Sequence, residues 1–252
     1  MNEVLAIGLS AMQGDMARLD QIGMNLTNVL TPGYKRGVTV QPPVGASFSE
    51  HLSRAGAADA TGSPSMAAVD LVRDTRPATL KSTGQSLDVA LAGKGYFEVL
   101  TDSGPAYTRG GSFHVDARGR LVTAQGYPVM GTGGEITLNL ARPVIGSSGA
   151  ITDPAAAPDA PPLGQLKVVE FDDDKRLERL GDGLLSAGAG MKQVADTELQ
   201  VRQGYLENSN VESTREMTSL IDTMRHFETV NKMVQGYDDM LGTAIRKLGE
   251  TS

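Results

Sequence analysis

The sequence predicts an α+β protein in which N- and C-terminal helices pair as a coiled coil and a central antiparallel all-β domain lies between them. At both chain ends, apolar residues recur at alternating steps of three and four, the heptad pattern of a coiled-coil helix. Between the ends, short alternating segments are separated by glycine-rich turns. We expect a helix within 1–36, an extended loop or linker at 37–82, a β-rich domain at 83–204 and a helix within 205–252.

The N-terminal helix carries one apolar stripe, in which Gly23 takes a single vacant position. Pro32 and Gly33 end the helix, because proline disfavours helix in the residue before it and glycine suits the exit turn. The predicted seam consists of Leu5, Leu9, Met12, Met16, Leu19, Leu26 and Leu30.

The C-terminal helix has a matching stripe with two polar members, Asn231 and Asp238. A polar residue in a seam sets register or partner number. A second apolar flank, formed by Val230, Met233, Tyr237 and Met240, indicates more than one neighbour. An intramolecular hairpin alone remains the alternative. The predicted seam runs through Met217, Leu220, Met224, Phe227, Asn231, Val234, Asp238, Leu241, Ile245 and Leu248.

The central zone reads as an antiparallel meander. Alternating or apolar segments at 87–91, 95–100, 106–109 and 165–171 predict strands, and glycine pairs between them predict turns. Two stretches rich in Ala, Gly, Ser and Pro, 42–64 and 146–162, are interpreted as loops or linkers that carry no chemistry.

Composition excludes several classes of protein. A net charge of −7 argues against a nucleic-acid binder, and the absence of cysteine excludes disulfides and thiolate metal sites. No run of 18 apolar residues predicts a membrane span, and the N-terminus lacks the basic and apolar regions of a cleaved signal peptide.

No catalytic constellation is found. His51, His114 and His226 lack partners at metal-ligand spacing, and no nucleophile elbow or phosphate loop occurs. We therefore expect no enzyme activity, no metal and no cofactor. An extracellular β-domain binding or adhesion module remains an alternative of a different class, and an enzyme with an unrecognised site a third.

Four motifs resemble the flagellar rod and hook family. Residues 25–36, NLTNVLTPGYKR, resemble the family's N-terminal NLANxxTxGFK, and 87–97, LDVALAGKGYF, resemble its LDVAIxGxGFF. Residues 107–113, YTRGGSF, followed by GRLV at 119–122, and 204–211, GYLENSNV, are similar to two further motifs. The motif residues expected to serve assembly are Asn25, Leu26, Asn28, Thr31, Gly33, Tyr34, Lys35, Leu206, Glu207, Ser209, Asn210 and Val211.

The resemblance implies a structural subunit of the bacterial flagellar basal-body rod. The terminal helices would form an inner domain and the β zone an outer one, with subunits in an open helical array. Expected partners are copies or paralogues of the chain, other rod and hook–basal-body subunits and the flagellar type III export apparatus. The expected location is the periplasm-spanning rod, reached without leader cleavage, with no nucleic acid bound and no direct membrane insertion.

The segment after the first motif bears on the position in the rod. The distal-rod type carries an aromatic, acidic stretch there, whereas this chain has GVTVQPP at 37–43. We therefore expect the proximal-rod type, with the distal-rod type as the alternative.

Overall fold

The structure is a computed structural model that describes residues 2–40, 70–139, 142–157 and 160–249. The chain divides into two compact units. The helical unit comprises 1–26, 37–72 and 212–252, and the β unit comprises 27–36 and 73–211. The loop expected at 42–64, with His51, lies outside the described residues. The expectation of an α+β protein with a central β domain is confirmed.

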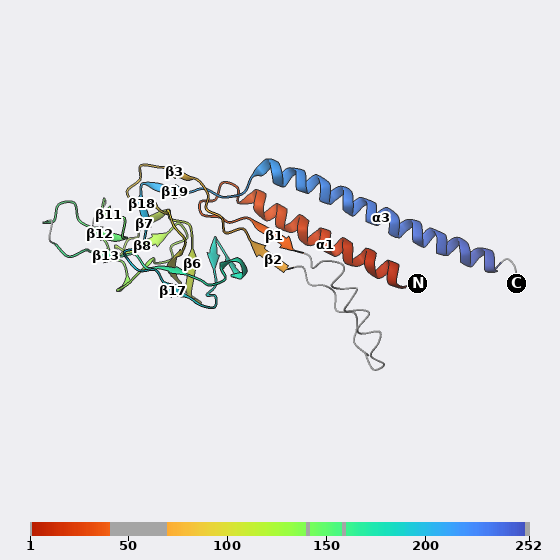
Figure 1. The fold of residues 1–252 in the computed structure, drawn as a ribbon, viewed down its shortest axis with the longest axis horizontal. Coiled ribbons are helices and arrows are strands. Elements are labelled where there is room, and N and C mark those ends of the chain that lie inside the picture. The colour runs from red at the N-terminus through yellow and green to blue at the C-terminus, as the bar shows by residue number, and fades with distance from the viewer. Residues whose placement is uncertain (1, 41–69, 140–141, 158–159, 250–252) are drawn as a thin grey trace, which may run out of the picture. The chain divides into compact units, whose positions relative to one another are not determined.

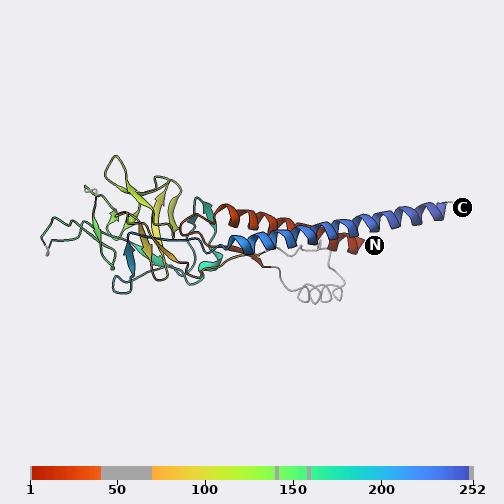
Figure 2. The ribbon, with the colours of Figure 1, turned by 90° about the horizontal axis from the view of Figure 1, so that it is seen from above.

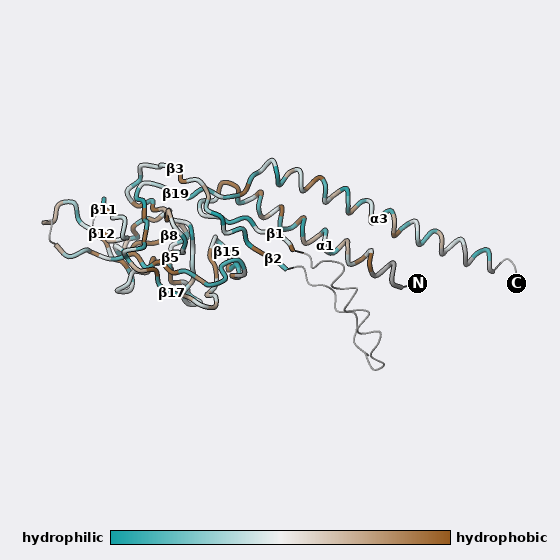
Figure 3. The backbone as a smooth tube through the Cα atoms, viewed as in Figure 1, coloured by the Kyte–Doolittle hydropathy of each residue, from teal (hydrophilic) through white to brown (hydrophobic). Residues whose placement is uncertain are grey.

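Two long helices dominate the helical unit. Helix α1 spans Asn2–Thr27 and α3 spans Ser213–Gly249, and the two lie side by side in Figures 1 and 2. Strands β1 (Gly37–Val40) and β2 (Asp70–Arg73) form a separate two-stranded sheet. Apolar and polar residues alternate along both helices in Figure 3. Within the described part of the chain, no helix is long and apolar enough to cross a membrane.

Three contacts fix the register of α1 against α3. A Cβ added at Gly8 would lie 2.8 Å from Val234 Cγ2, Asp15 Oδ2 lies 2.6 Å from His226 Nδ1, and Asn25 bonds Glu216 at 3.0 Å. Along these contacts the residue numbers of α3 decrease as those of α1 increase, so the two helices are antiparallel. At this register the last turns of α3 extend beyond the start of α1.

The residues buried between the helices repeat every seven positions. On α1 they include Gly8, Asp15 and Ile22, and on α3 they include Glu216, Thr223 and Val230. A period of seven is the repeat expected of a helix that keeps one stripe against a partner.

The expected seam residues have mixed exposure. Leu9, Met16, Met217 and Met224 are 50–56% exposed, and each directly follows a buried residue in the sequence. Met12, Leu19, Leu26, Leu220, Phe227, Asn231 and Val234 are half-buried. The side chains of Leu241 and Ile245 lie outside the described part. The role of these residues as an assembly seam therefore remains a prediction.

The β unit is antiparallel throughout its described strand pairs. Its largest sheet has the order β15 (Arg179–Gly181), β16 (Leu184–Leu185), β6 (Gly104–Thr108), β5 (Tyr96–Thr101), β14 (Val168–Glu170) and β17 (Lys192–Gln193). A second sheet joins β11 (Val144–Ile145), β12 (Ala150–Thr152) and β13 (Gly164–Gln165).

Four two-stranded pairs complete this unit, together with a short 3-10 helix at Asp174–Arg176. They are β3 (Leu80–Ser82) with β19 (Tyr205–Glu207), β4 (Val89–Leu91) with β18 (Val201–Gln203), β7 (Phe113–Val115) with β8 (Leu121–Thr123), and β9 (Met130–Gly131) with β10 (Gly134–Glu135).

The core of the β unit explains why these short strands hold together. Phe97 and Phe113 meet edge to face at 5.3 Å among fully buried aliphatic side chains. A second cluster packs Tyr96 and Tyr107 around Phe171. Sheets this short depend on side-chain burial more than on ladder length.

Three of the expected strands correspond to β4, β5 and β6, whereas the segment 165–171 is divided between β13 and β14. The interpretation of 146–162 as a loop is wrong for β12. Ile151, at its centre, is fully buried in the core, and that burial outweighs the turn-rich composition around it.

Candidate functional site

The N-terminal motif turns sharply after α1 and meets the C-terminal motif inside the β unit. Gly33 has a φ of 73°, and a Cβ there would lie 2.5 Å from the Arg109 carbonyl carbon. Its N–H donates to the Glu207 carbonyl at 2.8 Å. Both the positive φ and the close approach require glycine at this position.

Glu207 is the centre of a buried ionic cluster, here called the Glu207 cluster, with Lys35 and Arg109. Lys35 Nζ lies 2.6 Å from Glu207 Oε1, Arg109 Nε donates to Oε2, and the Ala78 N–H donates to Oε1 at 2.9 Å. The Glu207 side chain is 1% exposed. One carboxylate is therefore shared by two cations away from water.

Burial and charge oppose each other at these groups. Burial alone would raise the pKa of Glu207, but the charge of Arg109 and the hydrogen bonds from Ala78, Lys35 and Arg109 hold that pKa below its usual value. Burial lowers the pKa of Lys35, and the Glu207 carboxylate offsets part of this effect. The carboxylate is thus held in its charged form.

Arg109 extends the cluster to a third motif. Its guanidinium donates to the carbonyls of Leu91, Gly93 and Gly95, all in the segment 87–97. Gly111 comes equally close to that segment, because a Cβ there would lie 1.6 Å from the Val89 carbonyl oxygen. Four motifs that are distant in sequence therefore meet around one arginine and one glutamate.

Asn210 joins three segments through its amide. Its Oδ1 accepts from the Arg36 N–H at 2.7 Å, its Nδ2 donates to the Asp74 carbonyl at 2.8 Å, and its own N–H donates to the Tyr34 carbonyl at 3.3 Å. Tyr34 is buried with the Arg179 guanidinium 4.8 Å from its ring centroid.

The remaining motif residues of the β unit lie apart from the Glu207 cluster. Thr31 Oγ1 donates to Asn28 Oδ1 at 3.1 Å, which closes the turn after α1. Ser209 Oγ accepts from the N–H of the buried Val211 at 3.2 Å. Leu206 is half-buried in β19. The structure gives these residues local roles in shaping the chain.

A second polar cluster lies in the helical unit. Asn25, which is 1% exposed, donates from Nδ2 to the Gly37 carbonyl at 2.9 Å and to Glu216 at 3.0 Å. Its Oδ1 accepts from Gly37 N–H at 3.0 Å and from Gln21 Nε2 at 2.9 Å. Asn25 therefore ties α1 to α3 and to β1, while Leu26 beside it is half-buried.

Sequence reasoning missed Arg109 in the Glu207 cluster, Gln21 and Glu216 around Asn25, and the contact of Asp15 with His226 between the helices. Arg109 lies inside a recognised motif. A charged residue next to a strand predicted to be buried indicates a paired charge, and this signal could have identified it. Asp15 and Glu216 gave no comparable signal, because a single carboxylate on a helix is ordinarily solvated.

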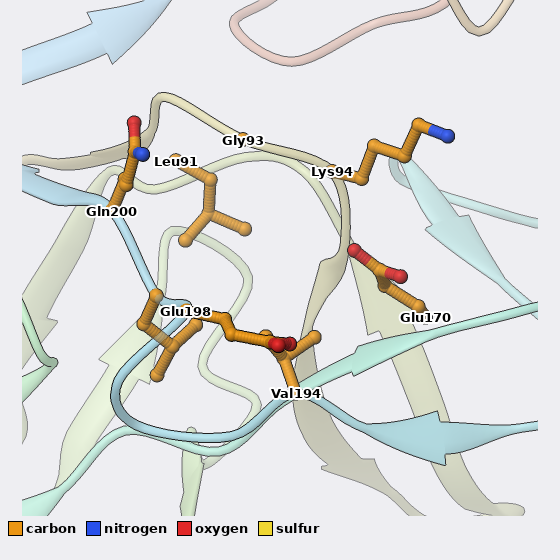
Figure 4. A pocket seen from close by; sticks show the side chains of 8 residues that line it. Leu91, Gly93, Lys94, Glu170, Val194, Glu198 and Gln200 are labelled. Atoms are coloured by element: carbon orange, nitrogen blue, oxygen red, sulfur yellow. The ribbon is translucent and has the colours of Figure 1, made fainter.

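The β unit also has a small hollow, shown in Figure 4, lined by apolar Leu91 and Val194 and by charged Lys94, Glu170 and Glu198. The Lys94 side chain points away from the Glu198 carboxylate. The hollow has a cavity volume of about 60 Å³, far below the ~300–1,000 Å³ of small-molecule sites. Among the residues that the structure describes, no group of acidic or histidine side chains could hold a metal ion.

The chain is similar in sequence to known flagellar proteins. Two family models match: "Flagellar basal body rod FlgEFG protein C-terminal" over 202–247, and "Flagellar hook protein FlgE/F/G D1 domain" over 90–153. The flagellar basal-body rod protein FlgG of Bacillus subtilis (strain 168) is 32% identical over 252 residues, covering 93% of this chain and 94% of that protein. The chain belongs to the flagellar basal-body rod protein family.

Other rod proteins match over similar lengths. The rod protein FlgF of Caulobacter vibrioides is 30% identical over 254 residues and covers 99% of both chains. The rod protein FlgG of Agrobacterium fabrum is 31% identical over 272 residues, covering 97% of this chain and 98% of that protein. In this rod protein, Arg109 lies in the segment matched by the D1-domain model, and Glu207 lies in the segment matched by the C-terminal model.

Proposed function

We propose that this rod-family protein is a structural subunit of the flagellar basal-body rod, not an enzyme. The observation that carries the proposal is the match to proteins named as rod subunits across nearly the full length of both chains. The Glu207 cluster supports it, because its charged groups are committed to one another and to backbone carbonyls. Such a cluster holds chain segments together, and its charged groups are already bonded within the chain instead of being placed to bind a substrate.

The proposal extends to the proximal rod, with the distal rod as the alternative. The absence of an aromatic, acidic stretch after Lys35 supports the proximal type. Labelling of this chain in isolated basal bodies tests its position: signal next to the hook would favour the distal rod.

The terminal helices supply the surface for assembly as a coiled coil. Leu9 and Met16 on α1, and Met217 and Met224 on α3, are exposed and each follows a residue buried between the helices. Because the helices are antiparallel, residues that follow the buried positions fall on the same side of the pair. This side is an apolar strip available to neighbouring subunits.

Rod assembly also implies the flagellar export apparatus as a transient partner, the basal body as the location, and entry without leader cleavage. Amino-terminal sequencing of the assembled chain tests the last point: an uncleaved Met1 or Asn2 is expected, and a start deep within α1 would contradict it.

The direct test is deletion of the gene followed by complementation. We expect non-motile cells without a complete rod, with swimming and the chain's presence in purified basal bodies restored by the wild-type gene. Normal swimming of the deletion strain, with the chain absent from basal bodies, would overturn the rod function. That result would favour the binding or adhesion module, whose activity should reside in the β unit.

A further inference from the structure

Arg73, the last residue of β2, is a buried cation. Its side chain belongs to a residue only 6% exposed, and its Nη2 donates to the Leu177 carbonyl. Among the described residues, its Nη1 is buried and has no hydrogen-bond partner. A buried N–H without an acceptor destabilises the fold, so this atom calls for an explanation.

Arg179 brings a second guanidinium to the same patch. It lies two residues beyond Leu177, stacks on Tyr34 at 4.8 Å and donates from Nη2 to the Lys35 carbonyl at 3.1 Å. The Asp74 N–H donates to the Arg36 carbonyl at 2.8 Å, which ties the segment after Arg73 to the segment of Tyr34. Arg179 is half-exposed and is therefore open to an incoming group.

Neither arginine forms an ion pair within the part of the chain that the structure describes. Burial lowers the pKa of Arg73, and the charge of Arg179 lowers it further, while Asp174 acts in the opposite direction. Asp174 directs its Oδ2 to the Tyr96 hydroxyl at 3.3 Å. Among the described residues, no carboxylate is hydrogen-bonded to either guanidinium, so two like charges share this patch.

We propose that Arg73 and Arg179 form a binding site for a carboxylate side chain of a neighbouring copy of this chain in the rod. A guanidinium offers a planar fork of donors that matches a carboxylate, and a carboxylate bound there supplies an acceptor for the Nη1 of Arg73 and a negative charge beside both guanidiniums. The carboxylate first contacts the half-exposed Arg179, and it reaches the buried Nη1 of Arg73 when the Arg179 side chain moves aside.

The occupant follows from charge complementarity and rests on the proposed rod function. The chain has 30 acidic and 23 basic residues, so a neighbouring copy presents an excess of carboxylates. Opposite charges across an interface fix register between partners more than they add affinity. The site would therefore orient subunits along the rod.

The chemistry is tested on the purified full chain with sodium acetate as the probe, against sodium chloride at equal ionic strength. We expect acetate to raise the Tm by about 3 °C at a concentration ten times its Kd. The rise should vanish in Arg179→Gln and persist in Arg118→Gln, which removes the same charge from an exposed arginine. Equal rises in all three proteins would overturn the site. If R179Q does not fold, Arg179→Lys replaces it and should show a smaller rise than wild type.

The source of the carboxylate is tested in cells, with Arg179→Glu and Arg118→Glu expressed in the deletion strain. We expect R179E to be exported but at least tenfold depleted from basal bodies, while R118E is incorporated normally. Normal incorporation of R179E would overturn the neighbouring subunit as occupant. Failure of the wild-type chain itself to enter basal bodies would instead overturn the rod function, while leaving the acetate result standing.

Discussion

Glu207 shows how a single residue holds distant segments of this chain together. Its carboxylate faces Lys35 and Arg109, and its backbone carbonyl accepts from Gly33. A buried ion pair of this kind adds little stability compared with apolar packing, but removing one partner leaves the other charges buried and uncompensated. We therefore expect the cluster to select one arrangement of the motifs more than to add stability.

Replacement of Glu207 tests that role. Glu207→Gln should destabilise the β unit by about 3–5 kcal/mol, because Lys35 and Arg109 then remain buried without a counter-charge. Urea unfolding followed by circular dichroism measures the change. Glu178→Gln provides the control, since Glu178 is exposed and its carboxylate makes no hydrogen bond or ion pair within the described residues. Equal midpoints for wild type and E207Q would contradict the cluster's role.

The same carboxylate predicts a pH dependence. The pKa of Glu207 is lower in the folded chain than its usual value, so the unfolded chain binds the proton more readily. Its stabilising contribution is therefore present above the unfolded pKa of about 4.3 and is lost as the pH falls through the folded pKa. The difference in Tm between wild type and E207Q should narrow below about pH 4. A difference that stays constant down to pH 2 would contradict this.

At the scale of single elements, the helices show what apolar pattern can and cannot reveal. The existence of α1 and α3 follows from the three–four spacing, which is a strong signal over long segments. The end of α1 does not, because the helix ends at Thr27, before the expected seam residue Leu30, which is 90% exposed. The stripe buried within the chain includes Gly8, Asp15, Glu216 and Thr223, which are small or polar. A search for regularly spaced apolar residues instead finds the residues next to this stripe, such as Leu9 and Met217. Apolar spacing alone therefore cannot tell residues that pair α1 with α3 from residues that contact neighbouring subunits.

That distinction leads to a prediction for the exposed strip. The double change Met217→Gln with Met224→Gln should leave the isolated chain's stability within about 0.5 kcal/mol, because both side chains are about half exposed. It should nevertheless weaken incorporation into basal bodies by removing apolar area from a contact between subunits. Arg225→Gln, on an exposed position of the same helix, is the matched control.

Two measurements decide this prediction: the Tm of the purified variants and their amounts in purified basal bodies. A large fall in Tm would show that the two methionines stabilise the chain itself. Normal incorporation of the double variant into basal bodies would show that Met217 and Met224 are not part of the assembly surface.

At the scale of the whole molecule, the motifs could be found from the sequence but their meeting point could not. Lys35, Arg109 and Glu207 lie far apart in the chain, and no local pattern says which cation approaches which carboxylate. Their contact depends on Gly33 and Gly111, which let backbones approach within distances that a side chain would forbid. The position of β12 was missed for a related reason, since long-range burial of Ile151 decides it.

The division into units predicts different effects for two N-terminal truncations. Residues 27–36 belong to the β unit, and they contribute Gly33 and Lys35 to Glu207. Deletion of 1–26 should therefore leave the β unit folded, whereas deletion of 1–36 should destabilise it by about 3–5 kcal/mol through loss of the Lys35 partner. Both truncations should abolish swimming, because both remove α1 and its apolar strip. Urea unfolding of chains 27–252 and 37–252 separates the two effects, and equal midpoints would show that the N-terminal motif is dispensable for the β fold. Normal swimming by either truncated strain would remove α1 from the assembly mechanism.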